Sequence, residues 1–410
     1  MLPFEEALGI VLNSARPLGA ERANLADASG RVLAEDVKSD MDIPPFNKSA
    51  MDGYACRRAD LAGDLELIET IPAGYTPTKS IGPGQCAKIM TGAVVPEGAD
   101  CVVMKEYVEA PRPNVVRLVR EKTAGACRGR LALESRAGSP RHKDNICLKG
   151  ENVKTGDVVL HKGTVLKPQH IAVLASVGQA RPKVSKMPRV GIVATGSELV
   201  DPSCVPEPSQ IRNSNSFQLA AQAGRVGVPV TNYGIVEDTR ETIDEMFVKI
   251  AADNDVVILS GGVSVGDFDL VPDILKRNNV DLLFESVAVK PGKPSVFGVS
   301  DDVYCFGLPG NPMATFVQFE ILVKPFLYKL MGCEYRRCVV HMPLGDDIVR
   351  TDTERQDWIP VAATDAGTVK PVEYHGSAHI SSLYSADGMT SIDAGLAVLK
   401  KGTIVPVRLI

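Results

Sequence analysis

The sequence predicts a multidomain α/β protein, in which a central three-layer domain with a parallel sheet is joined to β-rich segments. Between residues 189 and 327, a short apolar strand, a small-residue loop and a helix follow one another three times, with strands expected at 190–194, 255–260 and 303–308. Glycine and proline break residues 56–143 and 337–410 into short apolar runs, which is typical of small β domains. A chain of 410 residues has room for about two to four domains.

The order of these patterns places one predicted domain inside another. An amphipathic helix is expected at 3–15, with Phe4, Leu8 and Val11 on one face. Further helices are expected at 167–177, 213–224, 238–252 and 313–330. Residues 36–37 and 150–163 flank the β-rich segment, and we expect them to pair. The sequence therefore predicts a connecting module at 22–45 and 144–168, an inserted β domain at 46–143, a central domain at 1–21 and 169–331, and a C-terminal β-barrel-like domain at 332–410.

The composition argues against several classes of protein. The net charge is −5, its 45 basic and 50 acidic residues are well mixed, and aromatic residues make up 5%, so nucleic acid is not an expected partner. The amino end lacks a basic region followed by an apolar core, and no apolar run approaches the roughly 20 residues of a membrane-spanning helix. The nine cysteines are irregularly spaced without a C-x-x-C pair, which indicates free thiols. We therefore expect a cytoplasmic protein that binds neither nucleic acid nor a membrane.

Acidic residues follow the predicted strands of the central domain. In an open parallel sheet the loops behind the strands gather at the carboxyl edge, where ligands bind. These loops and helix starts carry Glu198, Asp238, Asp267 and Asp269. Each carboxylate alone is explained as well by a helix cap. Together they could hold Mg²⁺, which takes one or two carboxylates plus water and phosphate oxygens.

Two other motifs at this edge favour an anionic ligand. In the run Pro309-Gly-Asn-Pro312, Asn311 can cap a helix and Pro312 fits its first position, so that backbone N–H groups would face an oxyanion. The run Lys290-Pro-Gly-Lys-Pro294 places Lys290 and Lys293 on a turn between prolines. A plain helix cap and two solvated lysines are the simpler alternatives.

A further candidate site lies in the β-rich part. The loop 42–55 contains two adjacent prolines and Gly53, and it carries Asp52. Functional residues concentrate on such loops, although a solvated turn explains it equally well. Thr91 lies on a second tight turn, within Thr91–Asp100.

Taken in order, these motifs resemble the molybdopterin molybdenumtransferase family, the group of bacterial MoeA and the E domain of gephyrin. Each short motif is weak by itself, but the ordered set runs over nearly the whole chain and is very specific. The matching segments are 44–55, 89–93, 98–100, 195–199, 260–266, 290–294 and 308–312. The chain departs from the family pattern at Ser286, Cys147 and Asn152, where the family usually has lysine, arginine and aspartate.

The resemblance implies a homodimer with a site built between subunits. It implies a Mg²⁺-dependent reaction in which adenylylated molybdopterin and molybdate give molybdenum cofactor and AMP, with an upstream adenylyltransferase as a further partner. By motif, the resemblance assigns catalytic roles to Asp52, Thr91, Asp238, Asp269 and Lys290. It assigns substrate binding to Ser264, Lys293, Pro309, Asn311, Pro312 and Ser377, and metal binding to Glu198 and Asp269.

Three alternatives stay open at this point. The first is a non-catalytic dimeric scaffold on the same fold, although a scaffold need not keep the acidic and lysine residues. The second is an adenylyltransferase that acts one step earlier, against which the extra β-rich domains argue. The third is an insertase specific for tungstate, since these motifs do not distinguish the two oxyanions.

Overall fold

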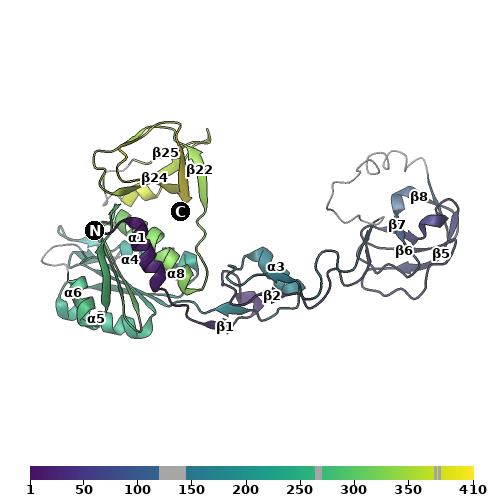
Figure 1. Ribbon diagram of the computed structural model, residues 1–410, viewed down its shortest axis with the longest axis horizontal. Helices are drawn as coiled ribbons and strands as arrows, with labels where there is room; N and C mark the ends of the chain where they lie inside the picture. The colour runs from purple at the N-terminus through teal and green to yellow at the C-terminus, as the bar shows by residue number, and fades with distance from the viewer. Residues whose placement is uncertain (120–144, 264–269, 374–375, 377–379) are drawn as a thin grey trace. The chain divides into compact units, whose positions relative to one another are not determined.

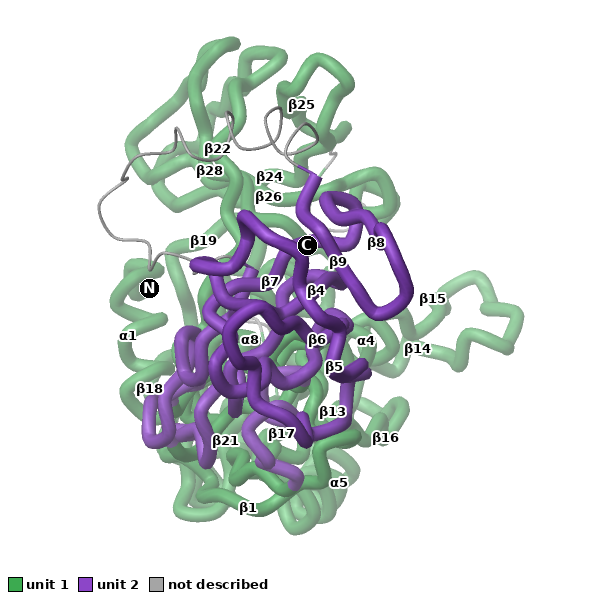
Figure 2. The backbone as a smooth tube through the Cα atoms, turned by 90° about the vertical axis from the view of Figure 1, so that its right-hand side faces the viewer, with its two compact units in different colours: residues 1–35, 162–171, 181–410 green, residues 36–161, 172–180 purple. Residues whose placement is uncertain are grey.

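The computed structural model describes residues 1–119, 145–263, 270–373, 376 and 380–410. They form two compact units, which Figure 2 colours separately. Unit 1 consists of Met1–Glu35, Lys162–Ile171 and Arg181–Ile410, and unit 2 of Asp36–His161 and Ala172–Ala180. The predicted fold class is confirmed, whereas the finer four-part division stays a prediction. None of the described helices combines the length and the apolar composition that a membrane crossing demands.

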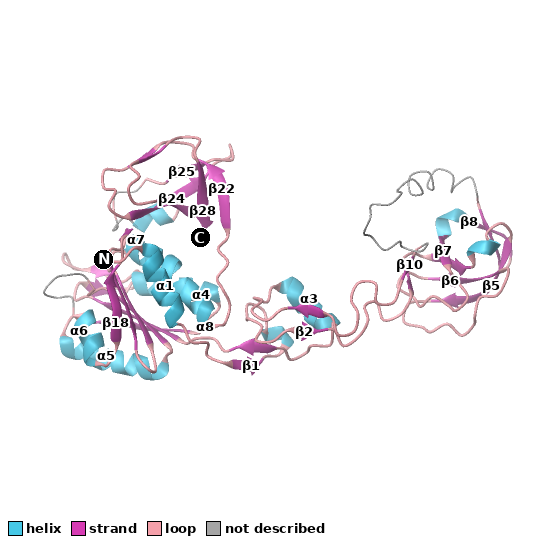
Figure 3. Ribbon diagram, viewed as in Figure 1, coloured by secondary structure: helices cyan, strands magenta, loops and turns pink. Residues whose placement is uncertain are grey.

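The centre of unit 1 is a sheet of six described strands in the order β16-β13-β17-β21-β20-β18. Figure 3 shows the strands of this sheet in magenta, with β18 labelled. Their bounds are β13 Val190–Thr195, β16 Val230–Val236, β17 Val256–Ser260, β18 Asp281–Ser286, β20 Pro294–Val299 and β21 Tyr304–Leu308. The three predicted strands correspond to β13, β17 and β21, which lie side by side and run parallel. The sheet is mixed rather than wholly parallel, because β20 runs antiparallel to both β21 and β18.

Helices cover both faces of this sheet, which explains the continuous apolar strands. All residues of β13, β17 and β21 are buried. Ile192 and Ile258 pack with α1 (Phe4–Ser14), α4 (Asn215–Val226), α7 (Pro312–Gln318) and α8 (Lys324–Leu330). Val193 and Val257, which point to the opposite face, pack with α5 (Arg240–Asp253) and α6 (Val271–Arg277). Figure 1 shows α1, α4 and α8 on one side of the sheet and α5 and α6 on the other, so the predicted three layers are present.

The predicted helices are confirmed to within about two residues at most ends, which is the usual uncertainty of helix boundaries. The helix expected at 167–177 is α3, Pro168–Ser176. Helix α5 begins as expected after Thr239, whose hydroxyl accepts a hydrogen bond from the Thr242 N–H. At the start of helix α4 the Asn213 side chain accepts a 3.2 Å hydrogen bond from the Ser216 N–H, whereas Ser214 makes no capping hydrogen bond. The end of the helix differs from the prediction, because it runs past Gly224 to the left-handed Gly227.

The long helix predicted at 313–330 is interrupted by a π-helical turn at Phe319–Val323. Pro325 follows this turn, and because proline has no N–H it cannot continue a regular helical ladder. The turn buries Glu320, whose Oε2 lies 2.8 Å from Lys324 Nζ and whose Oε1 accepts a hydrogen bond from Gln222. A charged residue is therefore satisfied inside a mostly apolar helix.

The C-terminal part of unit 1 is a second sheet, in the order β19-β24-β26-β28-β22 with β25 paired to β24. Its bounds are β19 Val289–Lys290, β22 Val339–Pro343, β24 Gln356–Ala363, β25 Val369–Pro371, β26 Gly388–Ile392 and β28 Ile404–Leu409, and β23 (Ile348–Val349) pairs with β27 (Val398–Leu399). Strand β19 ends at Lys290, the first residue of the predicted Lys290–Pro294 turn. It leaves the central sheet and runs parallel to β24, which sets Lys290 opposite Asp357.

Unit 2 contains a β sheet in the order β7-β4-β6-β5-β9-β8, as the β-rich pattern predicts. Its strands are β4 Gly53–Cys56, β5 Asp64–Ile71, β6 Gln85–Ile89, β7 Cys101–Met104, β8 Val108–Arg112 and β9 Val115–Leu118. The ends of this segment pair as expected, β2 (Val37–Lys38) with β11 (Val158–Leu160). A further short pair in unit 2 is β3 Lys48–Ser49 with β10 Ile146–Cys147. Two short pairs belong to unit 1, β1 Ala20–Arg22 with β12 Lys183–Ser185 and β14 Leu199–Val200 with β15 Ile211–Arg212.

Candidate active site

The loops at the carboxyl edge of the central sheet pack directly against one another. Gly261, which follows β17, has a φ of +101°, and a Cβ there would lie 2.4 Å from the Thr195 carbonyl oxygen at the end of β13. The Gly261 N–H also donates a 3.0 Å hydrogen bond to the Leu308 carbonyl at the end of β21. Only glycine fits this position, so the glycine-rich motif brings three strand ends together.

Asn215, at the start of α4, ties two of these loops together. Its Nδ2 donates to Ser260 Oγ at 2.9 Å and to the Gly310 carbonyl at 2.7 Å. Pro312 begins α7 and Asn311 occupies its N-cap position, as predicted, but the Asn311 side chain makes no capping hydrogen bond to the helix. Thr315 Oγ donates to the Pro309 carbonyl instead. Asn215 was missed by sequence reasoning because the Asn213–Ser216 run looks like an ordinary helix start.

Helix α7 also fixes the turn formed by Lys290–Pro294, called the lysine turn below. Gln318 Nε2 donates a 3.0 Å hydrogen bond to the Gly292 carbonyl, and Ser295 Oγ donates to the same oxygen at 2.9 Å. Gly292 has a φ of +109°, and a Cβ there would lie 2.4 Å from Gln318 Nε2. The turn that carries Lys290 is therefore held against a buried helix.

Replacing Gly292 with alanine is expected to lower the free energy of unfolding by about 2 to 4 kcal/mol, because an unfavourable backbone conformation and a steric overlap with Gln318 add up. Urea unfolding followed by the fluorescence of Trp358 measures this loss. Gly367→Ala is the matched control, since Gly367 also has a positive φ but a Cβ added there would meet no atom within 4 Å. The control should lose only about 1 kcal/mol. Equal losses in the two variants would contradict the overlap with Gln318.

A cleft of about 750 Å³ opens between the lysine turn, the Pro309–Asn311 loop and the C-terminal sheet. It is called the basic cleft below. Its charged lining residues are Lys290, Lys293, Arg350, Arg355 and Asp357. These four cations and one carboxylate are a charge balance that suits an anion.

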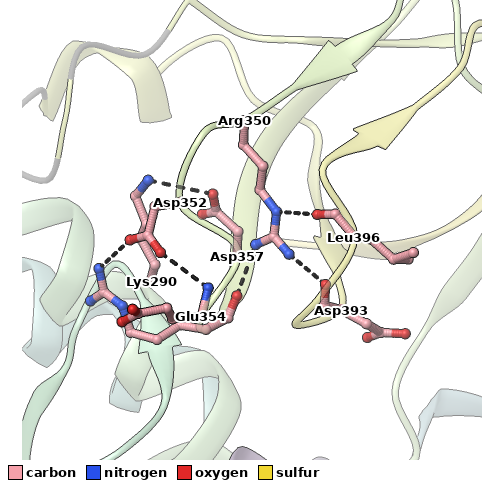
Figure 4. Close-up of polar contacts among 8 residues, drawn as sticks. Lys290, Arg350, Asp352, Glu354, Asp357, Asp393 and Leu396 are labelled. Carbon is pink, nitrogen blue, oxygen red and sulfur yellow. Dashed lines mark hydrogen bonds and ion pairs between the residues drawn. The ribbon is translucent and has the colours of Figure 1, made fainter.

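Arg350 builds the C-terminal wall of the basic cleft (Figure 4). Its guanidinium donates to the Leu396 carbonyl at 2.6 Å, to the Arg355 carbonyl at 2.8 Å and to the Asp393 carbonyl. Arg355 in turn donates to Asp352 at 2.9 Å. Neither arginine was identified from the sequence, because both lie in a segment without a recognisable motif and reach the cleft only through the fold.

Among the described residues, Asp357 is the one acidic side chain that lines the basic cleft. Its Oδ2 lies 3.8 Å from Lys290 Nζ, and only 8% of its side chain is exposed. Burial raises the pKa of Asp357, although the charges of Lys290, Arg350 and Arg355 oppose this shift. Sequence reasoning also missed this residue, which looks like an ordinary strand position.

The predicted acidic residues of the central edge are placed only in part. Glu198 is exposed after β13, and Asp238 is half-buried after the neighbouring strand β16. Ser264, Asp267, Asp269 and Ser377 lie outside the described residues. Within the described part of the chain, no group of three or more His, Cys, Asp or Glu residues could hold a metal ion.

In unit 2 the fold brings the two predicted residues Asp52 and Thr91 together. Asp52 Oδ1 accepts hydrogen bonds from the Thr91 N–H at 2.9 Å and from Thr91 Oγ at 2.8 Å, and Lys105 Nζ lies 3.4 Å from Asp52 Oδ2. The Thr91 backbone and side-chain hydrogen bonds lower the pKa of Asp52, with a smaller contribution from Lys105. Lys105 completes this cluster and was not predicted.

Thr91→Val is expected to raise the pKa of Asp52 toward its ordinary value, because it removes the hydroxyl donor and keeps the backbone donor. The folded-state pKa lies below the unfolded value, so Asp52 favours folding above the unfolded pKa, and this contribution disappears as the pH falls through the folded pKa. Carboxyl-carbon NMR of Asp52 measures the shift. Thr78→Val, which removes the corresponding hydroxyl beside Glu69, should leave the pKa of Asp52 unchanged. An unaltered pKa of Asp52 in Thr91→Val would contradict this assignment.

Comparison with known proteins matches the chain to one family along nearly its whole length. The MoeA N-terminal region (domain I and II) matches residues 2–178, the probable molybdopterin binding domain matches 191–329, and the MoeA C-terminal region (domain IV) matches 343–410. The three matches run in the order of the sequence motifs.

Full-length relatives agree with this. The molybdopterin molybdenumtransferase of Staphylococcus epidermidis is 37% identical over 94% of this chain and 90% of its own length, and that of Staphylococcus aureus is 35% identical over 100% and 95%. The crystal structure of the molybdopterin biosynthesis MoeA protein from Pyrococcus horikoshii OT3 matches with a TM-score of 0.81 and 31% identity, covering 100% of both chains. The chain belongs to the MoeA family of molybdopterin molybdenumtransferases, which act in molybdenum cofactor biosynthesis.

Proposed function

We propose that this chain inserts molybdenum from molybdate into adenylylated molybdopterin and releases AMP and molybdenum cofactor. The observation that carries the proposal is the basic cleft, which is lined by Lys290 and Lys293 of the lysine turn and by Arg355 of the C-terminal sheet region. Molybdate is a small dianion, and ammonium and guanidinium groups are its natural donors. The cleft volume lies within the range of about 300 to 1,000 Å³ that is common for small-molecule sites.

The lysine turn is proposed to bind the oxyanion and to stabilise charge that develops during the transfer. Lys290 is half-buried and sits on a turn that Gln318 and Ser295 hold rigidly. Such fixed donors stabilise a transition state without reorganisation. Pro309 and Asn311 line the same cleft, and Pro312 begins the helix behind it, so we propose that these residues shape the anion pocket. Ser264 and Ser377 are proposed to contribute from outside the described residues.

Glu198 and Asp269 are proposed to hold Mg²⁺, and Asp238 to act beside them. Glu198 and Asp238 follow the neighbouring strands β13 and β16. Their carboxylate oxygens are the donors that Mg²⁺ prefers, and the ion needs only one or two of them, so this donor set fits. When bound, Mg²⁺ would neutralise the phosphate link of the adenylylated substrate.

The Asp52 and Thr91 cluster is proposed to complete the site from the second subunit of a homodimer. Mixing Asp52→Ala dimers with Lys290→Met dimers tests this arrangement. If each site takes residues from both subunits, subunit exchange creates one intact site per mixed dimer and partly restores activity. Mixed dimers that form but remain inactive would contradict it.

The proposed reaction also implies a partner enzyme and a cellular compartment. An enzyme that attaches AMP to molybdopterin must supply the substrate, so an upstream adenylyltransferase is the proposed partner. Every cysteine in the described ranges is a free thiol, which fits a reducing compartment, and we propose the cytoplasm.

The test of the proposed function is AMP release by the purified chain supplied with Mg²⁺, molybdate and adenylylated molybdopterin. AMP and molybdenum cofactor should appear together in equal amounts. Binding of the substrate without AMP release would contradict the proposal and favour a non-catalytic scaffold. Molybdate and tungstate in competition, followed by metal analysis of the product, decide which oxyanion is preferred.

A further inference from the structure

We propose that Asp357 acts in the basic cleft as a neutral carboxylic acid that donates a hydrogen bond to the bound oxyanion, so that each anion binds together with about one proton. This inference rests on the proposed function, because it takes the basic cleft as the oxyanion site. It adds Asp357 and the proton of its carboxyl group to the proposed oxyanion site, and neither the sequence motifs nor the family comparison assigns them a role.

The position of Asp357 is set by the backbone. Asp357 is the second residue of β24, and its register partner in β19 is Lys290. Both side chains line the basic cleft, and Figure 4 shows them turned toward each other. The substrate-facing lysine and the carboxyl group are therefore neighbours in the fold, although they lie far apart in the sequence.

The surroundings of Asp357 suit a protonated carboxyl group better than a carboxylate. Its Oδ1 is buried and has no hydrogen-bond partner among the described residues. Its Oδ2 lies 3.8 Å from Lys290 Nζ, which is too long for a hydrogen bond. A carboxylate here would keep negative charge on a buried oxygen to which no described residue donates a hydrogen bond, which costs free energy.

Charged groups from both neighbouring segments act on Asp357. Lys290 lies on β19, while Arg350, Arg355 and Asp352 lie on the segment before β24. The three cations favour the carboxylate form, and burial and Asp352 favour the acid form. Arg350 and Arg355 both have other hydrogen-bond partners, since Arg350 donates to three carbonyl oxygens and Arg355 pairs with Asp352. Burial is the dominant influence, and it raises the pKa of Asp357.

A bound oxyanion strengthens this preference. A dianion near Lys290 brings like charge close to Asp357, which further disfavours the carboxylate. The neutral acid has the opposite effect, because its O–H can donate to an anion oxygen, whereas a carboxylate only accepts. The affinity for the anion should therefore fall as the pH rises through the pKa of Asp357, by up to roughly tenfold per pH unit.

Calorimetric titration with molybdate, and separately with sulfate, tests the proposal on the full-length chain. Titrations in buffers of different ionisation enthalpy count the protons that bind with each anion. Sulfate stays doubly charged near neutral pH, so a proton that enters with it is bound by the protein. The wild-type chain should take up about one proton per anion when the pH lies above the pKa of Asp357 in the free protein.

Asp357→Asn is the decisive variant, because the amide keeps the shape of the carboxylic acid and its ability to donate, but does not titrate. It should bind the anion with no proton uptake and with an affinity that no longer falls with pH. Asp347→Asn is the matched control: Asp347 lies in the same β domain, pairs with Lys400 at the surface, and should keep the wild-type proton uptake. A merely structural role of Asp357 would change affinity or stability without changing the proton count.

Three outcomes overturn the proposal: anion binding by the wild-type chain without proton uptake at a pH above the pKa of Asp357 in the free protein, unchanged proton uptake in Asp357→Asn, or binding that Lys290→Met leaves unaffected. Failure of this inference is distinguishable from failure of the proposed function. AMP release without proton-linked anion binding removes only the role of Asp357. Proton-linked anion binding without AMP release removes the transferase activity and leaves the oxyanion site.

Discussion

Lys290→Met is expected to slow AMP release by about 10² to 10³-fold, the usual effect of removing one preorganised donor from an active site. Methionine keeps the length and much of the volume of lysine but removes the charge that the basic cleft presents to an oxyanion. The substitution also removes a cation that lowers the pKa of Asp357. The rate of AMP release at saturating molybdate and adenylylated molybdopterin measures the effect.

Lys276→Met is the matched control for this prediction. Lys276 pairs with Glu285 at the surface, 2.7 Å away, and does not line the basic cleft. Its variant should release AMP at nearly the wild-type rate and unfold at nearly the wild-type temperature. A Lys290→Met protein with a wild-type rate would show that the lysine turn is not part of the reacting site.

Phe326→Ala is expected to lower the free energy of unfolding of unit 1 by about 3 to 5 kcal/mol, the typical cost of removing a buried aromatic ring. Phe326 is fully buried on α8. Its ring lies edge-on to those of Phe297, Tyr304 and Phe306, with centroids 5.7, 4.8 and 5.3 Å away. These three residues lie on β20 and β21, so this ring cluster joins the helical layer to the sheet.

Trp358 reports on this prediction directly, because it is the single tryptophan of the chain and belongs to the same core as Phe326. Urea unfolding followed by its fluorescence gives the loss. Phe217→Ala is the control, since Phe217 is 51% exposed on α4 and its removal should change stability by no more than about 0.5 kcal/mol. A loss below about 1 kcal/mol in Phe326→Ala would mean that the aromatic cluster does not hold the two layers together.

Local patterns explain which parts of the fold could be predicted. The strands β13, β17 and β21 are continuous apolar runs followed by glycine or proline, and both signals depend only on neighbouring residues. The Asp52 and Thr91 pair was predicted through motifs on two separate turns, and the fold joins them by hydrogen bonds. The π-helical turn was not predicted, because the run 313–330 reads as one continuous, mostly apolar helix in which Glu320 and Lys324 carry no signal of their own.

The residues that the C-terminal sheet region adds to the basic cleft could not be predicted from sequence patterns. Lys290 meets Asp357 because β19 leaves the central domain and pairs with β24, a long-range register that no local motif encodes. Arg350 and Arg355 become cleft residues for the same reason. Gln318 is a mid-helix residue by pattern, yet it fixes the lysine turn because α7 passes behind Gly292. Such residues are identified only after the sheets are assembled.

The position of the bound oxyanion tests whether the basic cleft is the molybdate site. Crystals of the full-length chain soaked in molybdate or tungstate, with data collected at the absorption edge of the metal, place the metal atom by anomalous scattering. We expect a peak in the basic cleft, within contact distance of Lys290 and Lys293 and beside Asp357. A strong peak elsewhere on the protein, with the basic cleft empty, would contradict it.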